Sequence, residues 1–362
     1  TTLTPAAVTK ALTDAGLKAA PTGIEHGTIT AVAGGKPFEV TTLRRDVETD
    51  GRRAVVAFTT DWAEDAQRRD FRLNALYADP NGKLYDPTAG GLADARAGRV
   101  VFVGEAETRI REDALRILRF FRFQAWYGKG EPDAVGLAAC AALKRLIRNL
   151  SAERVSTELL KLLAAEDPRG VVRLMAKTGV LSETLPEAQG VERFERLVGI
   201  ETEMLFTEDA LLRLAALLPN DPAVAESLSQ RLRLSNADRE RLVAALGTEP
   251  RLVSWQSPKE TRRQVYRLGA RAFCDRATLA WAASDRPAAA TQWRALIPTA
   301  RGWTPPRFAL TGEEVMAAGV PQGPLVGQVM REVEDWWVEN DFPDDELALI
   351  ERLKAVAQGM AY

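Results

Sequence analysis

Residues 109–119 read RIREDALRILR, a run of helix length with two adjacent carboxylates and several arginines at turn spacing. At about 100° per residue, Glu112, Asp113, Arg116 and Arg119 fall within an arc of about 120°. The apolar residues of the run fall on the opposite side. The pattern therefore predicts one amphipathic helix with a buried face and a polar face, and that polar row of donors and acceptors is suited to the edge of a nucleotide base.

The chain on either side of this run has two different patterns. The first 100 residues are mixed α/β. Helices are predicted to start at Thr4-Pro5 and at Thr60 or Asp61. Strands are predicted at 28–32 and 37–43, joined by a turn at Gly34-Gly35, and at 74–78, and the polar segment 44–53 is predicted as a loop. From about residue 105 onward, capped helical segments follow one another, and 288–306 is predicted to be a connector. The sequence therefore predicts an α+β chain, a small head with a sheet followed by a long helical body.

Composition excludes several classes of site. The chain has 362 residues, of which 46% are hydrophobic and 27% charged, as in ordinary soluble globular proteins. It lacks a run of about 18 apolar residues, so we expect no membrane span and a cytoplasmic protein. His26 is the only histidine, and Cys140 and Cys274 are the only cysteines. A histidine metal centre and a disulfide framework are excluded, and carboxylates would have to hold any hard cation such as Mg²⁺.

The overall charge of the chain does not indicate what it binds. The formal net charge is −2, so contact with nucleic acid would need local basic surface. Adjacent arginines at 68 and 69 suit a triphosphate, although a surface cluster of ion pairs would look the same. The C-terminal half carries further arginines, which either pair with acidic residues or contact RNA phosphates, at positions 231, 233, 239, 241, 262, 263, 267 and 271.

Four segments together resemble one known family. They are GIEHGT at 23–28, FEVTTLR at 38–44, RRDFRLNAL at 68–76 and EDALR at 112–116. They occur in the order seen in class II CCA-adding enzymes (tRNA nucleotidyltransferases), and the related bacterial poly(A) polymerases share most of the pattern. Each motif alone is weak, whereas four in order are specific. The resemblance is dense over residues 1–195 and looser beyond.

The resemblance implies a division of labour along the chain. Residues 1–95 would be a nucleotidyltransferase head with an incomplete sheet, and 96–195 a helical neck that selects the nucleotide. Residues 196–362 would be a helical body and tail that bind tRNA. The implied activity is addition of C, C and A to tRNA 3′ ends from CTP and ATP with Mg²⁺.

The neck motif would select the base. Cytosine and adenine both present an amino donor beside a ring-nitrogen acceptor, and guanine and uracil reverse that order. An aspartate and an arginine one turn apart are therefore able to accept C and A and reject G and U. The resemblance places Asp113 and Arg116 on the base, Arg119 and Arg122 at the nucleotide, and Glu112 against Arg116. The alternative is a solvated helix with i,i+4 ion pairs such as Glu112–Arg116.

The head motifs would hold the rest of the nucleotide. The resemblance assigns Arg69 to the nucleotide, Asp70 and Asn74 to the ribose side, and Glu39, in the middle of a strand, to the metal site as its third carboxylate. The family usually has threonine where this chain has Arg72. An Arg72 that points to solvent would be harmless, and one that points inward would alter the ribose pocket.

One expected motif is missing. Family members carry an Asp-x-Asp pair that holds Mg²⁺, and this sequence contains none. The simplest interpretation is that the chain lacks an N-terminal segment of its natural protein, so that as it stands it does not catalyse transfer. Three alternatives to the full CCA-adding activity remain: a bacterial poly(A) polymerase, an enzyme that adds only CC or only A, and a non-catalytic RNA-binding protein.

Overall fold

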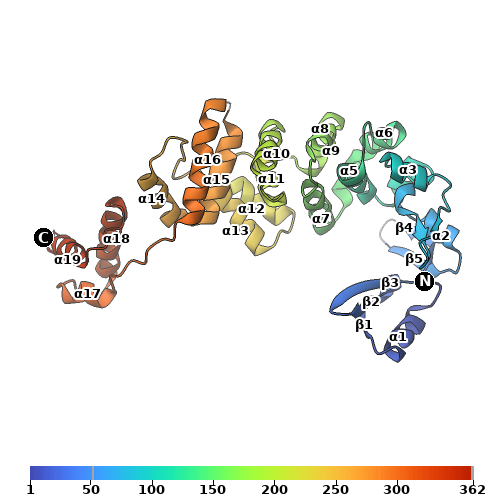
Figure 1. The fold of residues 1–362 in the computed structure, drawn as a ribbon, viewed down its shortest axis with the longest axis horizontal. Helices are drawn as coiled ribbons and strands as arrows, with labels where there is room; N and C mark the ends of the chain where they lie inside the picture. The colour runs from blue at the N-terminus through green and yellow to red at the C-terminus, as the bar shows by residue number, and fades with distance from the viewer. Residues whose placement is uncertain (51–52, 285, 360–362) are drawn as a thin grey trace. The chain divides into compact units, whose positions relative to one another are not determined.

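The computed structural model describes residues 1–50, 53–284 and 286–359 (Figure 1). These residues divide into two compact units. The first unit comprises Thr1–Val191, Phe206–Leu214 and Leu228–Leu234, and the second comprises the rest of the described chain. None of the described helices has both the length and the apolar character that a membrane span needs.

The head begins with a helix and a three-stranded antiparallel sheet. Thr4 caps α1 (Pro5–Asp14), whose first residue is proline, as the fixed φ of proline favours. The strands β1 (Lys18–Gly23), β2 (Thr28–Ala33) and β3 (Lys36–Thr41) follow in the order β1-β2-β3, with η1 (Ile24–His26) between the first two. The predicted strands at 28–32 and 37–43 are confirmed in this sheet, with β3 ending at Thr41.

The predicted loop at 44–53 is wrong over the residues that the structure describes. β4 (Arg44–Asp50) and β5 (Arg53–Phe58) form an antiparallel pair in which Arg44 lies opposite Phe58. The polar sequence of β4 suggests a loop, but pairing with an apolar neighbouring strand decides its structure. Residues 51 and 52 lie outside the described residues.

The segment after β5 leads to the loop that the site uses. Asp61 caps α2 (Trp62–Gln67), its carboxylate accepting from the Ala63 N–H at 2.7 Å. The elements that follow are η2 (Arg72–Asn74), β6 (Tyr77–Ala78), β7 (Leu84–Tyr85) and α3 (Gly91–Ala97). The strand predicted at 74–78 is thus limited to Tyr77–Ala78, because a 3₁₀ turn occupies residues 72–74.

The run at 109–119 is two helices, so the prediction of one continuous helix is wrong. α4 (Ala106–Glu112) ends at Asp113, whose backbone is extended at φ −150° and ψ 104°, and α5 (Leu115–Tyr127) begins two residues later. The Asp113 carboxylate accepts from the Leu115 N–H at 3.1 Å. An aspartate that bonds to the backbone two residues ahead competes with the helix and starts a new one.

The apolar side of α5 packs into an aromatic core. Phe120 and Phe121 are fully buried, and Phe120 stacks on Phe102 with ring centroids 5.6 Å apart. Phe71, from the loop after α2, packs against Phe102 and Phe123 in the same cluster. This core fixes the loop after α2 against the start of α5, which brings the polar residues of both segments together.

From residue 134 onward, every regular element of the described chain is an α-helix or a 3₁₀-helix. In chain order they are α6 (Ala134–Leu143), η3 (Lys144–Asn149), α7 (Ala152–Leu163), α8 (Arg169–Thr178), α9 (Val180–Thr184), α10 (Glu192–Met204), α11 (Ala210–Leu217), α12 (Pro222–Arg231), α13 (Asn236–Ala245), α14 (Pro258–Leu268), α15 (Ala270–Ala283), η4 (Pro287–Ala289), α16 (Ala290–Gly302), α17 (Gly312–Ala317), α18 (Pro324–Glu339) and α19 (Glu346–Gly359). The connector predicted at 288–306 is wrong, because α16 occupies most of it. Trp293, Ile297 and Ala300 are buried at helical spacing, and their burial outweighs the internal Pro298.

Candidate functional site

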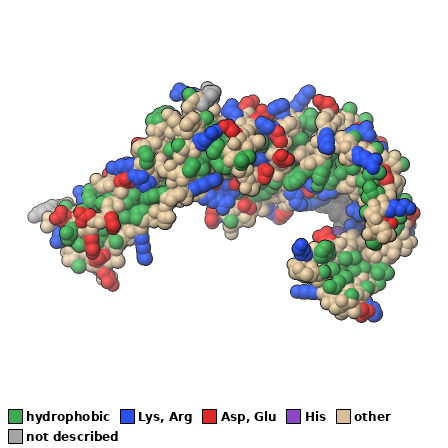
Figure 2. Space-filling view, viewed as in Figure 1, with side chains coloured by type: hydrophobic (Ala, Val, Ile, Leu, Met, Phe, Trp, Pro, Cys, Tyr) green, Lys and Arg blue, Asp and Glu red, His purple; other side chains and the backbone are tan. Residues whose placement is uncertain are grey.

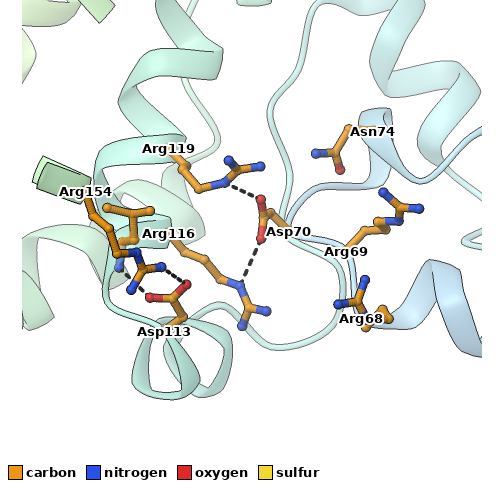
Figure 3. A pocket seen from close by; sticks show the side chains of 9 residues that line it. Arg68, Arg69, Asp70, Asn74, Asp113, Arg116, Arg119 and Arg154 are labelled. Carbon is orange, nitrogen blue, oxygen red and sulfur yellow. Dashed lines mark hydrogen bonds and ion pairs between the residues drawn. The ribbon is translucent and has the colours of Figure 1, made fainter. Parts of the chain in front are cut away.

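A cavity of about 290 Å³ lies in the first unit, between the loop after α2 and the break that separates α4 from α5 (Figure 3). Its lining is rich in arginine and consists of Arg68, Arg69, Asp70, Asn74, Asp113, Leu115, Arg116, Arg119 and Arg154. Five arginines against two aspartates make the lining strongly positive, which suits an anionic ligand. Most of the residues proposed from the sequence are therefore neighbours in space.

Arg116 is the most buried arginine of the cavity, with 9% of its side chain exposed. Its Nε donates to Asp70 at 3.0 Å, and its Nη1 donates to Glu112 at 2.6 Å and to the Arg109 carbonyl at 2.7 Å. Burial lowers the pKa of Arg116, but the two carboxylates outweigh it, and the pKa is raised overall. The guanidinium is therefore permanently charged and held in one orientation.

Asp70 joins the loop after α2 to α5. Besides Arg116, it accepts from Nε of Arg119 at 2.5 Å (Figure 3). Sequence reasoning missed the next member of this network, Glu158 on α7. It lies 3.7 Å from Arg119 and accepts from Arg122 Nε at 2.5 Å, with 6% of its side chain exposed. A glutamate between the buried residues of an amphipathic helix was the signal for it, because such a charge needs a partner.

Arg122 lies outside the cavity lining. Its guanidinium carbon lies 4.6 Å from the centroid of the Phe123 ring, and its Nε binds Glu158. The resemblance placed Arg122 at the nucleotide, whereas in the structure it contacts the residues behind Arg119. Arg122 and Arg119, one turn apart on the same face of α5, therefore share Glu158 as a partner.

Asp113 lies at the helix break, on the opposite side of the cavity from Arg69. Its Oδ2 accepts from Arg154 Nη2 at 2.7 Å, while its other oxygen accepts from the Leu115 N–H (Figure 3). Arg154 is a second residue that sequence reasoning missed. It comes from α7, 41 positions along the chain, so no local pattern marks it.

The arginines of the loop after α2 are positioned through their neighbours. Arg69 donates from Nη2 to Asp65 at 2.8 Å, and Tyr77 donates to the same carboxylate at 2.8 Å. Burial and this hydrogen bond raise the pKa of Tyr77 to about 12. Arg109 Nη2 donates to the carbonyls of Arg68 and Arg69 at 2.7 and 2.9 Å, which fixes the backbone of the loop.

Asn74 and Glu39 occupy different surroundings. Asn74 lines the cavity, and its Oδ1 accepts from the Phe71 N–H at 3.1 Å, which closes the turn before it. Glu39 is exposed in the middle of β3, opposite Thr30, and does not line this cavity.

The carboxylates in the described part of the chain form no ready-made metal centre. No three acidic, histidine or cysteine side chains gather there in an arrangement able to hold a metal. The two aspartates at the cavity, Asp70 and Asp113, are each held by arginines. Both carboxylates are therefore already engaged by cations of the protein itself.

Arg72 points neither to free solvent nor into the cavity. Its Nε lies 2.7 Å from the fully buried carboxylate of Asp94, which Arg99 also contacts at 2.9 Å. We expect Arg72→Ala to lower the free energy of unfolding by about 1–3 kcal/mol, because a buried carboxylate loses one of its two partners. CTP affinity should not change.

Urea unfolding and calorimetric titration with CTP test this expectation for Arg72. The matched control is Arg99→Ala, which removes the more exposed partner of the same carboxylate and should destabilise less. Weaker CTP binding with unchanged stability would instead assign Arg72 to the nucleotide.

The arginines of the C-terminal half are mostly paired with acidic residues. The ion pairs are Arg231–Glu187, Arg233–Glu153, Arg239–Glu226, Arg241–Asp275, Arg262–Asp341 and Arg267–Asp335. In Figure 2, Lys and Arg side chains are interspersed with Asp and Glu side chains over the helices. This pairing favours the interpretation of these arginines as a solvated, neutralised face.

Comparisons with known proteins point to the same family over most of the chain. Residues 1–101 match the family described as "Poly A polymerase head domain", and residues 133–190 match "Probable RNA and SrmB- binding site of polymerase A". The chain is 32% identical over 336 residues to CCA tRNA nucleotidyltransferase 1, mitochondrial, of Danio rerio, covering 88% of this chain and 73% of that protein. It is 30% identical over 366 residues to the protein of the same name from Mus musculus, covering 98% and 81%.

Solved structures show the same fold. The crystal structure of the Bacillus stearothermophilus CCA-adding enzyme in complex with CTP has a TM-score of 0.77 and 25% identity, covering 99% of this chain and 88% of that chain. The Thermotoga maritima CCA-adding enzyme complexed with tRNA has a TM-score of 0.60 at 18% identity, which shows a shared fold. The predicted α+β class, a small sheet followed by a helical body, is confirmed.

Proposed function

Because this chain belongs to the family of class II CCA-adding enzymes and poly(A) polymerases, we propose that its site selects CTP and ATP for the addition of C, C and A to tRNA 3′ ends. One observation carries the proposal. The cavity joins the Asp113–Arg116 pair, which suits a base, to the arginines of the loop after α2, which suit a triphosphate. A single nucleotide would span both parts of this lining.

The base end of the cavity selects by hydrogen bonding. Asp113 accepts from the amino group of cytosine or adenine, and Arg116 donates to the adjacent ring nitrogen. Guanine and uracil present these groups in the opposite order, so they would leave the aspartate and the arginine unpaired. Nε and Nη1 of Arg116 are already bound by protein acceptors, so its Nη2 is the donor that we assign to the base.

The arginines at the triphosphate end of the cavity attract negative charge. Arg69 has 37% of its side chain exposed, and Arg68 lines the cavity beside it. Their backbone carbonyls are held by Arg109, so the loop is positioned before the ligand arrives. Such preorganisation reduces the conformational entropy lost on binding. Mg²⁺ as a cofactor and the cytoplasmic location both remain predictions.

Equilibrium titration of the 362-residue chain with each of the four nucleoside triphosphates tests the proposal. We expect CTP and ATP to bind about tenfold or more tightly than GTP and UTP, because one reversed donor–acceptor pattern costs about 1–3 kcal/mol. Equal affinity for all four would contradict it. Binding of ATP without CTP would favour a poly(A) polymerase.

A transfer assay separates binding from catalysis. With tRNA that lacks its 3′ CCA, labelled CTP or ATP and Mg²⁺, we expect this chain to incorporate no nucleotide, because its sequence contains no Asp-x-Asp pair. Efficient addition of C and A would overturn the expectation of inactivity and support the proposed function.

A further inference from the structure

Trp255 is the most exposed aromatic side chain in the described part of the chain, with 69% of its surface accessible. It belongs to the segment between α13 and α14, in the second unit. A single exposed apolar side chain is ordinary in a soluble protein. Trp255 is unusual because the residues beside it are buried.

Both sequence neighbours of Trp255 are buried polar residues with hydrogen-bond partners. Ser254 is bound to Gln292 of α16, with 2.7 Å between the side-chain oxygens, and Gln256 donates to Gln264 of α14 at 2.7 Å. The same Gln256 side chain accepts from the Val253 N–H at 3.2 Å. These contacts fix the backbone on both sides, so the exposed indole is held outward by a rigid support.

The charges near Trp255 in the sequence are mainly positive. Arg251 and Lys259 lie four positions before and after it, and both are exposed. The one acidic residue of this stretch, Glu260, is engaged as a cap and accepts from the Ser257 N–H at 2.7 Å. Lys259 also lies near Asp341, whose carboxylate is paired with Arg262. An exposed indole with cations four positions away on either side in the sequence matches a nucleobase with its adjoining phosphates better than it matches an apolar protein surface.

We propose that Trp255 is a stacking platform for an unpaired nucleobase of the RNA substrate, with Arg251 and Lys259 at the neighbouring phosphates. The proposal rests on the proposed function for its partner, which is RNA. It adds a contact point outside the nucleotide cavity. Stacking on an aromatic ring tolerates any base, so this contact contributes affinity rather than sequence preference.

Binding of tRNA to Trp255→Ala tests the proposal. We expect the affinity to fall on the order of tenfold, since loss of one base–aromatic stack has an effect of that size. Trp255→Phe should retain most of the affinity, because it keeps an aromatic face. The matched control is Leu347→Ala, which removes an exposed apolar side chain of the same unit, 75% accessible, and should bind like the wild type.

Two further measurements separate the alternatives. A blunt RNA duplex of matched length has no unpaired base, so Trp255→Ala should bind it as the wild type does. CTP affinity of the same variant should also be unchanged, because the nucleotide cavity lies in the first unit.

Wild-type tRNA affinity in Trp255→Ala, or an equal loss on the duplex, would overturn the inference and leave the proposed function standing. A wild-type protein that binds neither tRNA nor CTP would overturn both. If the substitution converts a dimer to a monomer in sedimentation without changing RNA affinity, the indole contacts a second copy of the chain, and the inference is wrong.

Discussion

Arg116→Ala is expected to abolish measurable CTP and ATP binding and to lower the free energy of unfolding by about 3 kcal/mol. Arg116 supplies three hydrogen bonds, to Asp70, to Glu112 and to the Arg109 carbonyl. Without it, the partly buried carboxylates of Asp70 and Glu112 each lose one cationic partner, next to the position we assign to the base. Asp70 keeps Arg119 and Glu112 keeps Arg109, which places the loss at the lower end of the range for breaking a buried ion pair.

Calorimetric titration and urea unfolding measure both effects of Arg116→Ala. The matched control is Arg213→Ala in the same unit, because Arg213 is buried and donates to the Leu163 and Ala165 carbonyls away from the cavity. It should destabilise the protein and leave CTP affinity intact in the remaining folded protein. Unchanged CTP affinity in Arg116→Ala would show that the base does not bind at this arginine.

Asp113→Asn is expected to reduce the preference for CTP and ATP over GTP and UTP by about tenfold. The amide keeps one oxygen to accept from the Leu115 N–H, so the start of α5 is preserved. It replaces the other oxygen with a donor, which no longer matches the amino group of cytosine or adenine. Asp113→Ala should show the same loss of preference and an additional destabilisation of about 1 kcal/mol, from the lost hydrogen bond with the Leu115 N–H.

Competition among the four nucleotides on each variant measures this preference. Arg154→Ala is the matched control, because it removes the ion-pair partner of Asp113 and leaves the carboxylate in place. We expect that variant to keep its preference for C and A. If both Asp113 variants discriminate as well as the wild type, the selection of the base is made elsewhere.

The sequence predicted the elements whose signals are local. Thr4 with Pro5 marks one helix start and Thr60 or Asp61 marks another, and in the structure Thr4 and Asp61 are the caps. The turn at Gly34 and Gly35 joins two predicted strands, and both glycines have positive φ, at 55° and 77°. Such signals depend on a few adjacent residues, so they can be read without the rest of the fold.

Two of the predictions that were wrong, those for β4 and for α16, depended on other parts of the chain. The residues of β4 are polar, and the strand exists because β5 lies beside it. α16 forms in a segment rich in tryptophan and proline because its apolar side chains find a core. The break at Asp113 shows the opposite case, in which helical spacing continues but one local hydrogen bond ends the helix.

By itself, the sequence determined which residue types the site contains, the order of its motifs and the family to which they belong. The i,i+4 pair of Glu112 and Arg116 was also visible in it. Beyond that pair, only the tertiary structure decided which carboxylates the arginines of the site contact. Asp70 binds Arg116 and Arg119, 46 and 49 positions away, and the pairing arises because the aromatic core brings two distant segments together. Contacts of that separation depend on packing, which no spacing rule within one helix encodes.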